Sequence, residues 1–205
     1  MRWPRRDNGA STASFLNSTA VGPILPDAGT PGPGLATRLR PGKRGGMGNW
    51  GEFSTVRPDL SEAGRALLYQ HGVGLGFLAT TRKDGGPRVH PMCPILTTDG
   101  VFAFIVPSPK QRDLHRDGRY AIHSFPCPDN EDAFFFSGSA RLVEDATVRA
   151  DLGEQFVQER SQFPVDPPGD HDALFEFVLD SCLLTRTTGH GDPRPIHVVW
   201  QSESR

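Results

Sequence analysis

The sequence predicts a mainly β domain with short helices (α+β), in which about six antiparallel strands curl into a barrel. Two observations carry this prediction. Apolar stretches of strand length follow one another, separated mostly by tight turns, and about three short helical patterns interrupt them. The strands do not alternate regularly with helices, which disfavours a parallel βαβ layout. The length of 205 residues suits one domain with an additional tail.

The first predicted elements are a helix and a β-hairpin. Asp59 is placed to cap a helix whose apolar residues recur on one face, and Gly72 can end that helix. The apolar residues 73–81 predict a strand, and a Lys-Asp-Gly-Gly turn leads into the returning arm 88–96. Two prolines in this arm cannot donate ladder hydrogen bonds, so we expect a bulge or a sheet edge there.

The remaining elements follow the same logic. Residues 101–106 predict a strand, and Ser108 followed by Pro109 is a typical start of a short helix. A further helix, capped by Asp145, has apolar residues on one face. Strands are also predicted at residues 119–125, 133–143, 174–186 and 196–200. A Ser-Gly-Ser sequence inside the second of these indicates a bend.

Charge is distributed unevenly along the chain. The total of 22 Lys and Arg and 24 Asp and Glu gives a net charge of −2, but residues 1–46 carry +5 and residues 47–205 carry −7. An acidic domain excludes the uniformly basic surface of a typical nucleic-acid-binding protein. The chain has no apolar run long enough to span a membrane. Three scattered cysteines fit a reducing, cytoplasmic location rather than a disulfide framework.

Residues 1–46 differ from the rest in composition. They contain six Pro and eight Gly without helical or strand periodicity, and their few apolar residues could not offset the entropy of ordering the backbone. We interpret the segment as a disordered extension or as a mis-assigned start. The second interpretation is favoured, because ordered-domain composition begins directly after Met47. A transit peptide is disfavoured, since no amphipathic helix is present. We expect the function to reside in residues 47–205.

One group of residues is suited to binding a phosphate. The helix start at Ser108 offers backbone N–H groups, a positive dipole end and a hydroxyl, and Lys110 and Arg112 add charge. Arg88, on the neighbouring predicted strand, could reach the same anion with its guanidinium fork. The alternative interpretation is ordinary helix capping, with the cations facing water.

These residues also resemble a known family. The stretch 76–81 with 84–91 is similar to the first hairpin of the pyridoxamine 5'-phosphate oxidase-like, flavin-binding split-barrel proteins. The spacing Ser108-x-Lys110-x-x-Asp113 then resembles their phosphate-binding helix, and the resemblance covers roughly residues 60–145. It implies a six-stranded antiparallel split β-barrel that forms a homodimer, with FMN in a groove between the subunits.

The resemblance also implies roles for individual residues. Arg88 and Lys110 would hold the FMN phosphate, and Ser108 would donate a further hydrogen bond. The cofactor would additionally be contacted or bordered by Val89, His90, the strand around Phe104, the basic residue Arg112 and, from the partner subunit, Trp200. No catalytic residue is predicted. No metal site is expected either, because the seven histidines show no paired zinc-ligand spacing.

Two departures from the family pattern shape the predicted function. Asp113 stands where members usually carry Asn, and the C-terminus lacks the Arg/His substrate motif of true pyridoxamine phosphate oxidases. We therefore predict an FMN-dependent oxidoreductase that acts on a different small organic substrate. A deazaflavin-dependent reductase, which would bind a 5-deazaflavin coenzyme, and a non-catalytic flavin- or haem-binding protein stay open as alternatives.

Overall fold

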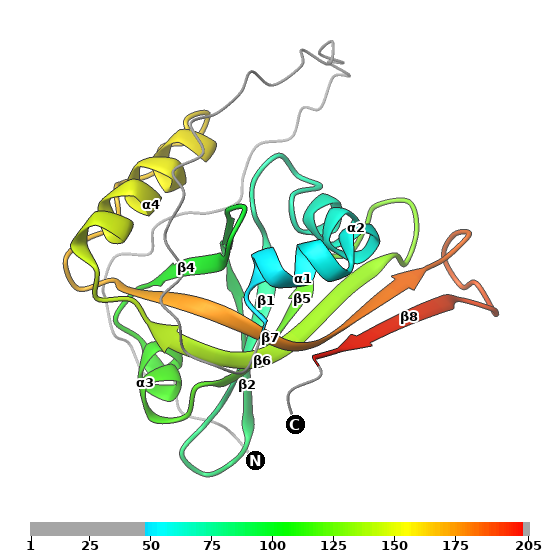
Figure 1. Cartoon of the computed structure of the whole chain (residues 1–205), viewed down its shortest axis with the longest axis horizontal. Coiled ribbons are helices and arrows are strands. Elements are labelled where there is room, and N and C mark those ends of the chain that lie inside the picture. Colours follow the sequence, from blue (N-terminus) through cyan, green and yellow to red (C-terminus); the bar gives the residue numbers. More distant parts are fainter. Residues whose placement is uncertain (1–47, 203–205) are drawn as a thin grey trace, which may run out of the picture. The chain divides into compact units, whose positions relative to one another are not determined.

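The structure is a computed structural model that describes residues 48–202 (Figure 1). The interpretations of residues 1–46 and of a start at Met47 concern residues outside this range. Within it, the helices are α1 (Trp50–Val56), α2 (Pro58–Leu68), α3 (Pro109–Arg116) and α4 (Ala146–Glu159). The strands are β1 (Gly76–Thr81), β2 (Pro87–Met92), β3 (Ile95–Leu96), β4 (Val101–Ile105), β5 (Arg119–Ser124), β6 (Ala133–Leu142), β7 (Ala173–Arg186) and β8 (Ile196–Gln201).

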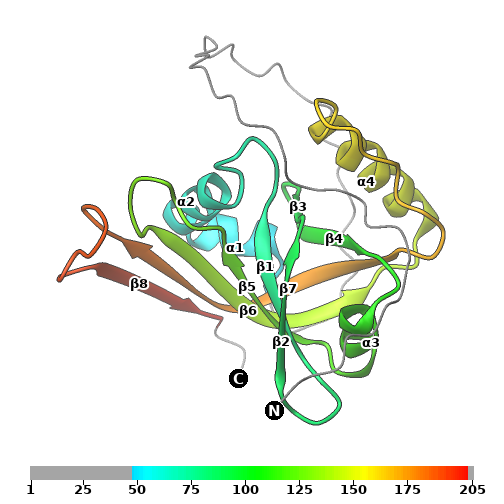
Figure 2. The same ribbon diagram turned by 180° about the vertical axis from the view of Figure 1, so that it is seen from behind.

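The strands form one antiparallel sheet that curls upon itself. Its hydrogen-bonded order is β2-β1-β5-β6-β7-β4-β3, and β8 pairs with β7 outside this path. The two ends of the path, β2 and β3, are separated by only two residues of chain, so the sheet must bend until its ends approach each other. The β7–β8 hairpin extends away from this curled part as an arm (Figures 1 and 2). The predicted mainly β, antiparallel architecture is confirmed.

Several sequence predictions need correction. The described residues contain eight strands rather than six, partly because the arm predicted at 88–96 is divided into β2 and β3 by Cys93 and Pro94. Helix α1 was not predicted; it is short and its N-cap, Asn49, follows a glycine-rich stretch. Asp59 is not a helix cap, because α2 begins one residue earlier and Asp59 forms an ion pair with Arg57 at 2.6 Å.

Other local predictions are confirmed. β2 is the edge strand at one end of the sheet path, as its prolines required. Asp145 caps α4 by accepting hydrogen bonds from the N–H groups of Thr147 and Val148 at 2.8 and 3.1 Å. Ser108 caps α3, with proline at the first helical position.

The core lies between the concave side of the sheet and helices α1 and α2 (Figure 1). Trp50 and Phe53 of α1 are almost completely buried, and the Trp50 ring contacts Phe134 and Phe136 of β6 edge-on. A smaller apolar cluster lies under α4 and includes Leu152. Helices α1 and α2 therefore cover the concave side of the sheet, and α4 covers the smaller cluster near β3.

A bulge bends the central strands at the predicted Ser-Gly-Ser sequence. The register of β6 against β7 shifts between Ser137 and Gly138. A Cβ atom at Gly138 would lie 2.0 Å from the carbonyl oxygen of Val178, so the two backbones approach more closely than any side chain permits. Glycine at this position is thus required by the curvature of the sheet.

We expect Gly138→Ala to lower the free energy of unfolding by about 1–3 kcal/mol, the cost of forcing an extra methyl group into a packed interior. Gly153→Ala in α4 is the matched control, since a Cβ there meets no atom within 4 Å. That variant should raise stability by up to about 1 kcal/mol through helix propensity. Urea denaturation measures both values, and equal effects of the two changes would contradict the assignment.

Candidate functional site

The site is built around helix α3, which follows β4 directly. The Ser108 hydroxyl accepts from the Gln111 N–H at 3.4 Å and donates to the Val106 carbonyl at 2.8 Å. The Gln111 side-chain amide donates to the carbonyl oxygens of Ile105 and His171 at 2.8 and 3.1 Å. These bonds fix the start of α3 against the end of β4 and the loop before β7. The Ser108 hydroxyl is therefore already used twice, once as the helix cap and once as a donor to the Val106 carbonyl.

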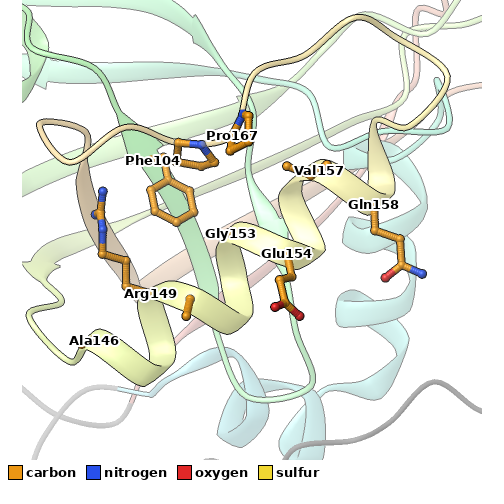
Figure 3. Close-up of a pocket in the computed structure, with 10 residues that line it drawn as sticks. Phe104, Ala146, Arg149, Gly153, Glu154, Val157, Gln158 and Pro167 are labelled. Carbon is orange, nitrogen blue, oxygen red and sulfur yellow. The ribbon is translucent and has the colours of Figure 1, made fainter.

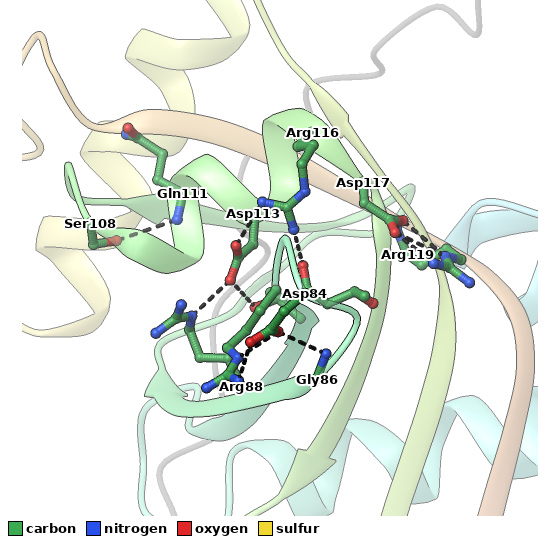
Figure 4. A network of polar contacts seen from close by, with 12 residues as sticks. Asp84, Gly86, Arg88, Ser108, Gln111, Asp113, Arg116, Asp117 and Arg119 are labelled. Atoms are coloured by element: carbon green, nitrogen blue, oxygen red, sulfur yellow. Dashed lines mark hydrogen bonds and ion pairs between the residues drawn. The ribbon is translucent and has the colours of Figure 1, made fainter.

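A buried carboxylate joins α3 to the hairpin of β1 and β2 (Figure 4). Asp113 is 3% exposed. One of its oxygens accepts from Arg88 Nε at 2.7 Å and from the Thr80 hydroxyl at 3.2 Å, and the other accepts from Arg116 Nη1 at 3.0 Å. Arg116 also donates to the carbonyl of Thr81. Side chains from β1, β2 and α3 thus meet at a single acidic group.

This network carries more positive than negative charge, which favours the binding of an anion. Burial alone would raise the pKa of Asp113, but the hydrogen bonds from Arg88, Arg116 and Thr80 outweigh it and hold the pKa below its usual value. One carboxylate therefore faces two guanidinium groups. Arg88 uses only its Nε, and within residues 48–202 its Nη1 and Nη2 have no hydrogen-bond or ion-pair partner. Nη1 and Nη2 of Arg88 are therefore available as a pair of donors, and this planar arrangement suits a phosphate.

Lys110 contributes a second cation beside β2. Its Nζ donates to the Pro91 carbonyl at 3.3 Å, three residues along the strand from Arg88. Partial burial lowers the pKa of this ammonium, and no carboxylate among the described residues pairs with it. A bound anion would offset this cost of desolvation. The structure thus joins Arg88 to α3 through Asp113 and Lys110 to β2 through the Pro91 carbonyl, whereas the Ser108 hydroxyl contacts Val106 and Gln111 at the start of α3.

The other residues predicted for the site have different positions. Val89 and His90 are exposed on β2, and Arg112 is exposed on α3. The Phe104 side chain points beneath α4, where its ring meets Phe156 edge-on. Trp200 packs against Phe53 of its own chain, with ring centroids 4.8 Å apart, on the arm of β7 and β8. Within one chain, Phe104 and Trp200 therefore do not join the cations of β2 and α3.

A pocket of about 700 Å³ opens where Phe104 lies (Figure 3). It is bounded by one face of α4, by Phe104 of β4 and by Pro167 and Pro168. The loop of residues 169–172 connects it to the start of α3, because this loop accepts hydrogen bonds from Gln111 on one side and from Arg149 of α4 on the other.

Sequence reasoning missed the partners that organise the cations. Thr80 and Arg116 were not singled out, and Asp113 was noted only as a departure from the family pattern. The spacing of Asp113 and Arg116 is typical of a helical ion pair, which could have indicated part of the network. The link to Arg88 lies 25 residues away and has no local signal.

The described residues limit two other classes of site. Within residues 48–202, no three His, Cys, Asp or Glu side chains are gathered so that they could hold a metal ion. None of the helices in this range has both the length and the apolar character needed to cross a bilayer.

The fold has counterparts among solved structures. A haem-binding protein from Mycobacterium smegmatis is similar at a TM-score of 0.51 and 15% identity, over 66% of this chain and 57% of that one. A putative pyridoxamine 5'-phosphate oxidase from Listeria innocua gives 0.48 and 18%, over 58% and 93% of the two chains. General stress protein 26 from Bacillus anthracis gives 0.47 and 17%, over 67% and 97%.

The fold of residues 48–202 is thus similar to that of the haem-binding protein, and a putative pyridoxamine 5'-phosphate oxidase is among the similar structures. At these identities the similarity concerns the fold alone. Comparisons with protein-family profiles and with curated proteins give no match. A link to a phosphate-bearing cofactor therefore rests on the sequence resemblance of the hairpin and helix described above.

We expect Asp113→Asn to lower the free energy of unfolding at pH 7 by about 1–3 kcal/mol, because two partly exposed guanidinium groups lose their buried counterion. The lowered pKa means that this contribution is complete above the ordinary Asp pKa of about 3.9. It is lost as the pH falls through the lower value of the folded state. Urea denaturation between about pH 6 and about pH 3 should therefore show a weaker acid dependence in the variant.

Asp151→Asn provides the control, since this exposed carboxylate of α4 forms no hydrogen bond or ion pair among the described residues and should matter little for stability. Equal stability losses in the two variants would contradict the central role of Asp113.

Proposed function

We propose that this chain binds FMN and acts as a flavin-dependent oxidoreductase on a small organic molecule. The observation that carries the proposal is the pair of incompletely used cations at the interface of β2 and α3. Arg88 has two free Nη groups, and Lys110 has only a backbone carbonyl as partner among the described residues. Both positions match those that bind the phosphate in the split-barrel resemblance.

The residues present fit a phosphate monoester. Arg88 would bind it through its outer fork, whose orientation is fixed by Asp113, and Lys110 would add a charge from the side of α3. Ser108 would have to give up its bond to the Val106 carbonyl in order to donate to the phosphate. Val89, His90 and the backbone around Phe104 would border the ribityl chain or ring, and Arg112 would add charge at the periphery.

A bound flavin would supply hydride transfer at its N5 atom, while the protein binds and orients the cofactor and excludes water. A location in the cytoplasm is part of this proposal, since the three cysteines are all free.

A second copy of the chain completes the proposed site. One row of paired positions crosses the outer face of the sheet from β2 to β8 and is apolar except for one histidine. The row consists of Pro91, Phe77, His123, Phe135, Leu183 and Val199. Phe77 is also stacked on Phe125, with ring centroids 4.4 Å apart, and Val199 is 59% exposed. Such a continuous apolar row is typical of a surface that another protein covers. Trp200 lies on the opposite face of β8 from Val199, so it would have to leave Phe53 in order to cover the cofactor ring of a partner subunit.

A haem-binding carrier is the second candidate, because the haem-binding protein from Mycobacterium smegmatis shares the fold. A deazaflavin coenzyme is a third candidate, since the cations of β2 and α3 recognise a phosphate and not the ring attached to it. The absorption spectrum of natively purified protein separates these cofactors. Flavin bands support the proposal, whereas a Soret band, or a colourless protein that does not bind added FMN, overturns it.

Lys110→Ala should weaken FMN binding by about 1–3 kcal/mol, the range for one charge-assisted hydrogen bond. Riboflavin, which lacks the phosphate, should bind the variant and the parent protein equally. Fluorescence titration measures both affinities. Arg119→Ala removes an equal charge from an exposed ion pair and should leave FMN binding unchanged. An unchanged FMN affinity in Lys110→Ala would show that the phosphate binds elsewhere.

Leu183→Arg should convert the protein from a dimer to a monomer, because a buried, unpaired cation at the centre of the apolar row is costly. Light scattering should give twice the chain mass of 22.4 kDa for the parent protein and the single mass for the variant. Val56→Arg changes a valine that is 65% exposed on α1 and should stay dimeric. A monomeric parent protein would rule out a site shared between subunits.

A further inference from the structure

The pocket beneath α4 is separate from the cations of β2 and α3. Its volume of about 700 Å³ lies in the range of small-molecule sites. One wall is the face of α4 formed by Ala146, Ala150, Gly153 and Val157. Phe104 and the two consecutive prolines 167 and 168 also line the pocket, and Figure 3 shows Phe104 and Pro167 on the side opposite α4.

Gly153 has no structural reason to be a glycine. It lies in the interior of α4, where glycine costs about 1 kcal/mol relative to alanine. Its φ is not in the left-handed region, and a Cβ atom there would meet nothing within 4 Å. This contrasts with Gly138, where the backbone of β7 leaves no room. The packing of residues 48–202 therefore leaves the space over Gly153 open.

The far end of the pocket carries a fixed cation. The Arg149 guanidinium lies 5.2 Å from the centre of the Phe104 ring. Its Nη1 and Nη2 donate to the carbonyls of Asp172 and Gly169 at 2.6 and 2.5 Å. Among the described residues it forms no ion pair with a carboxylate. Its position is therefore set by neutral carbonyls, and its charge is not neutralised.

The two acidic groups nearby do not pair with Arg149. The Asp172 carboxylate accepts from the Gly169 N–H at 2.8 Å and so stabilises the loop that holds the arginine. Glu154 lines the pocket, and Figure 3 shows its side chain extending away from Phe104. The pocket is thus apolar along its length and positive at the end where Phe104 and Arg149 meet.

We propose that this pocket binds a flat aromatic anion, such as an aromatic carboxylate or sulfonate. The ring would lie between Phe104 and the open face at Gly153, against the prolines, and the acidic group would contact Arg149. This site is independent of the phosphate-binding cations, so the inference goes beyond the proposed function and does not depend on it.

The test uses the full chain and the fluorescent probe 8-anilinonaphthalene-1-sulfonate, an aromatic sulfonate. We expect saturable binding that Gly153→Leu weakens by about tenfold or more, because the new side chain fills the pocket. That variant should stay folded, since leucine favours a helix and meets no clash in the open space. Thr147→Leu, on an exposed position of α4 outside the pocket, is the matched control and should bind the probe as the parent does. Unchanged binding in Gly153→Leu overturns the proposal.

The charge preference is tested by displacement of the probe. 1-Naphthoate should compete at least about tenfold better than 1-naphthylmethylammonium, which has the same ring and the opposite charge. Arg149→Met should remove this preference, and Arg149→Lys should restore part of it. Equal competition by the two compounds in the parent protein overturns the assignment of an anionic ligand, whether or not the Arg149 variants fold.

FMN affinity distinguishes this inference from the proposed function. Gly153→Leu should leave FMN binding unchanged, and Lys110→Ala should leave probe binding unchanged. A parallel loss of FMN and probe binding in Gly153→Leu would mean that the pocket holds the flavin ring, and it would overturn the separate site. Failure of FMN binding alone would overturn only the proposed function.

Discussion

The buried carboxylate of Asp113 is the interaction on which the rest of this structure depends. It accepts hydrogen bonds from β1, β2 and α3 at once, through Thr80, Arg88 and Arg116. A carboxylate can be buried only when such donors compensate its desolvation, so the three elements must keep their relative positions. The same constraint holds β2 in place beside α3. The geometry of the candidate phosphate site therefore follows from the contacts that join α3 to β1 and β2.

This arrangement gives an acidic domain a local excess of positive charge. The residues from 47 onward carry a net charge of −7, yet the interface of β2 and α3 has more cations than carboxylates. Asp113 neutralises one positive charge without occupying the outer donors of Arg88. An exposed carboxylate at this position would oppose phosphate binding. The buried carboxylate of Asp113 instead holds Arg88 in place.

The pocket between β4 and α4 depends on a different principle, in which a small residue and fixed side chains keep space open. Gly138 is required because two strands approach too closely for a Cβ atom, whereas Gly153 faces a pocket that the fold leaves empty of side chains. A glycine thus marks a crowded position in one place and an open position in another, and only the surrounding atoms distinguish the two. Loop 169–172, held by Gln111 and Arg149, connects this pocket to the start of α3 without merging the two sites.

The sequence by itself determined the local elements: the caps at Ser108 and Asp145, the edge position of β2, and most strand positions, because these depend on side chains that act on their own neighbourhood. It also placed Arg88 on the returning arm of the hairpin and Lys110 on the following short helix. The tertiary structure decided the division of the arm at Cys93 and Pro94, the position of Phe104 beneath α4, and the partner of Arg88. Those features arise from contacts between residues far apart in the chain, and local sequence patterns therefore cannot predict them.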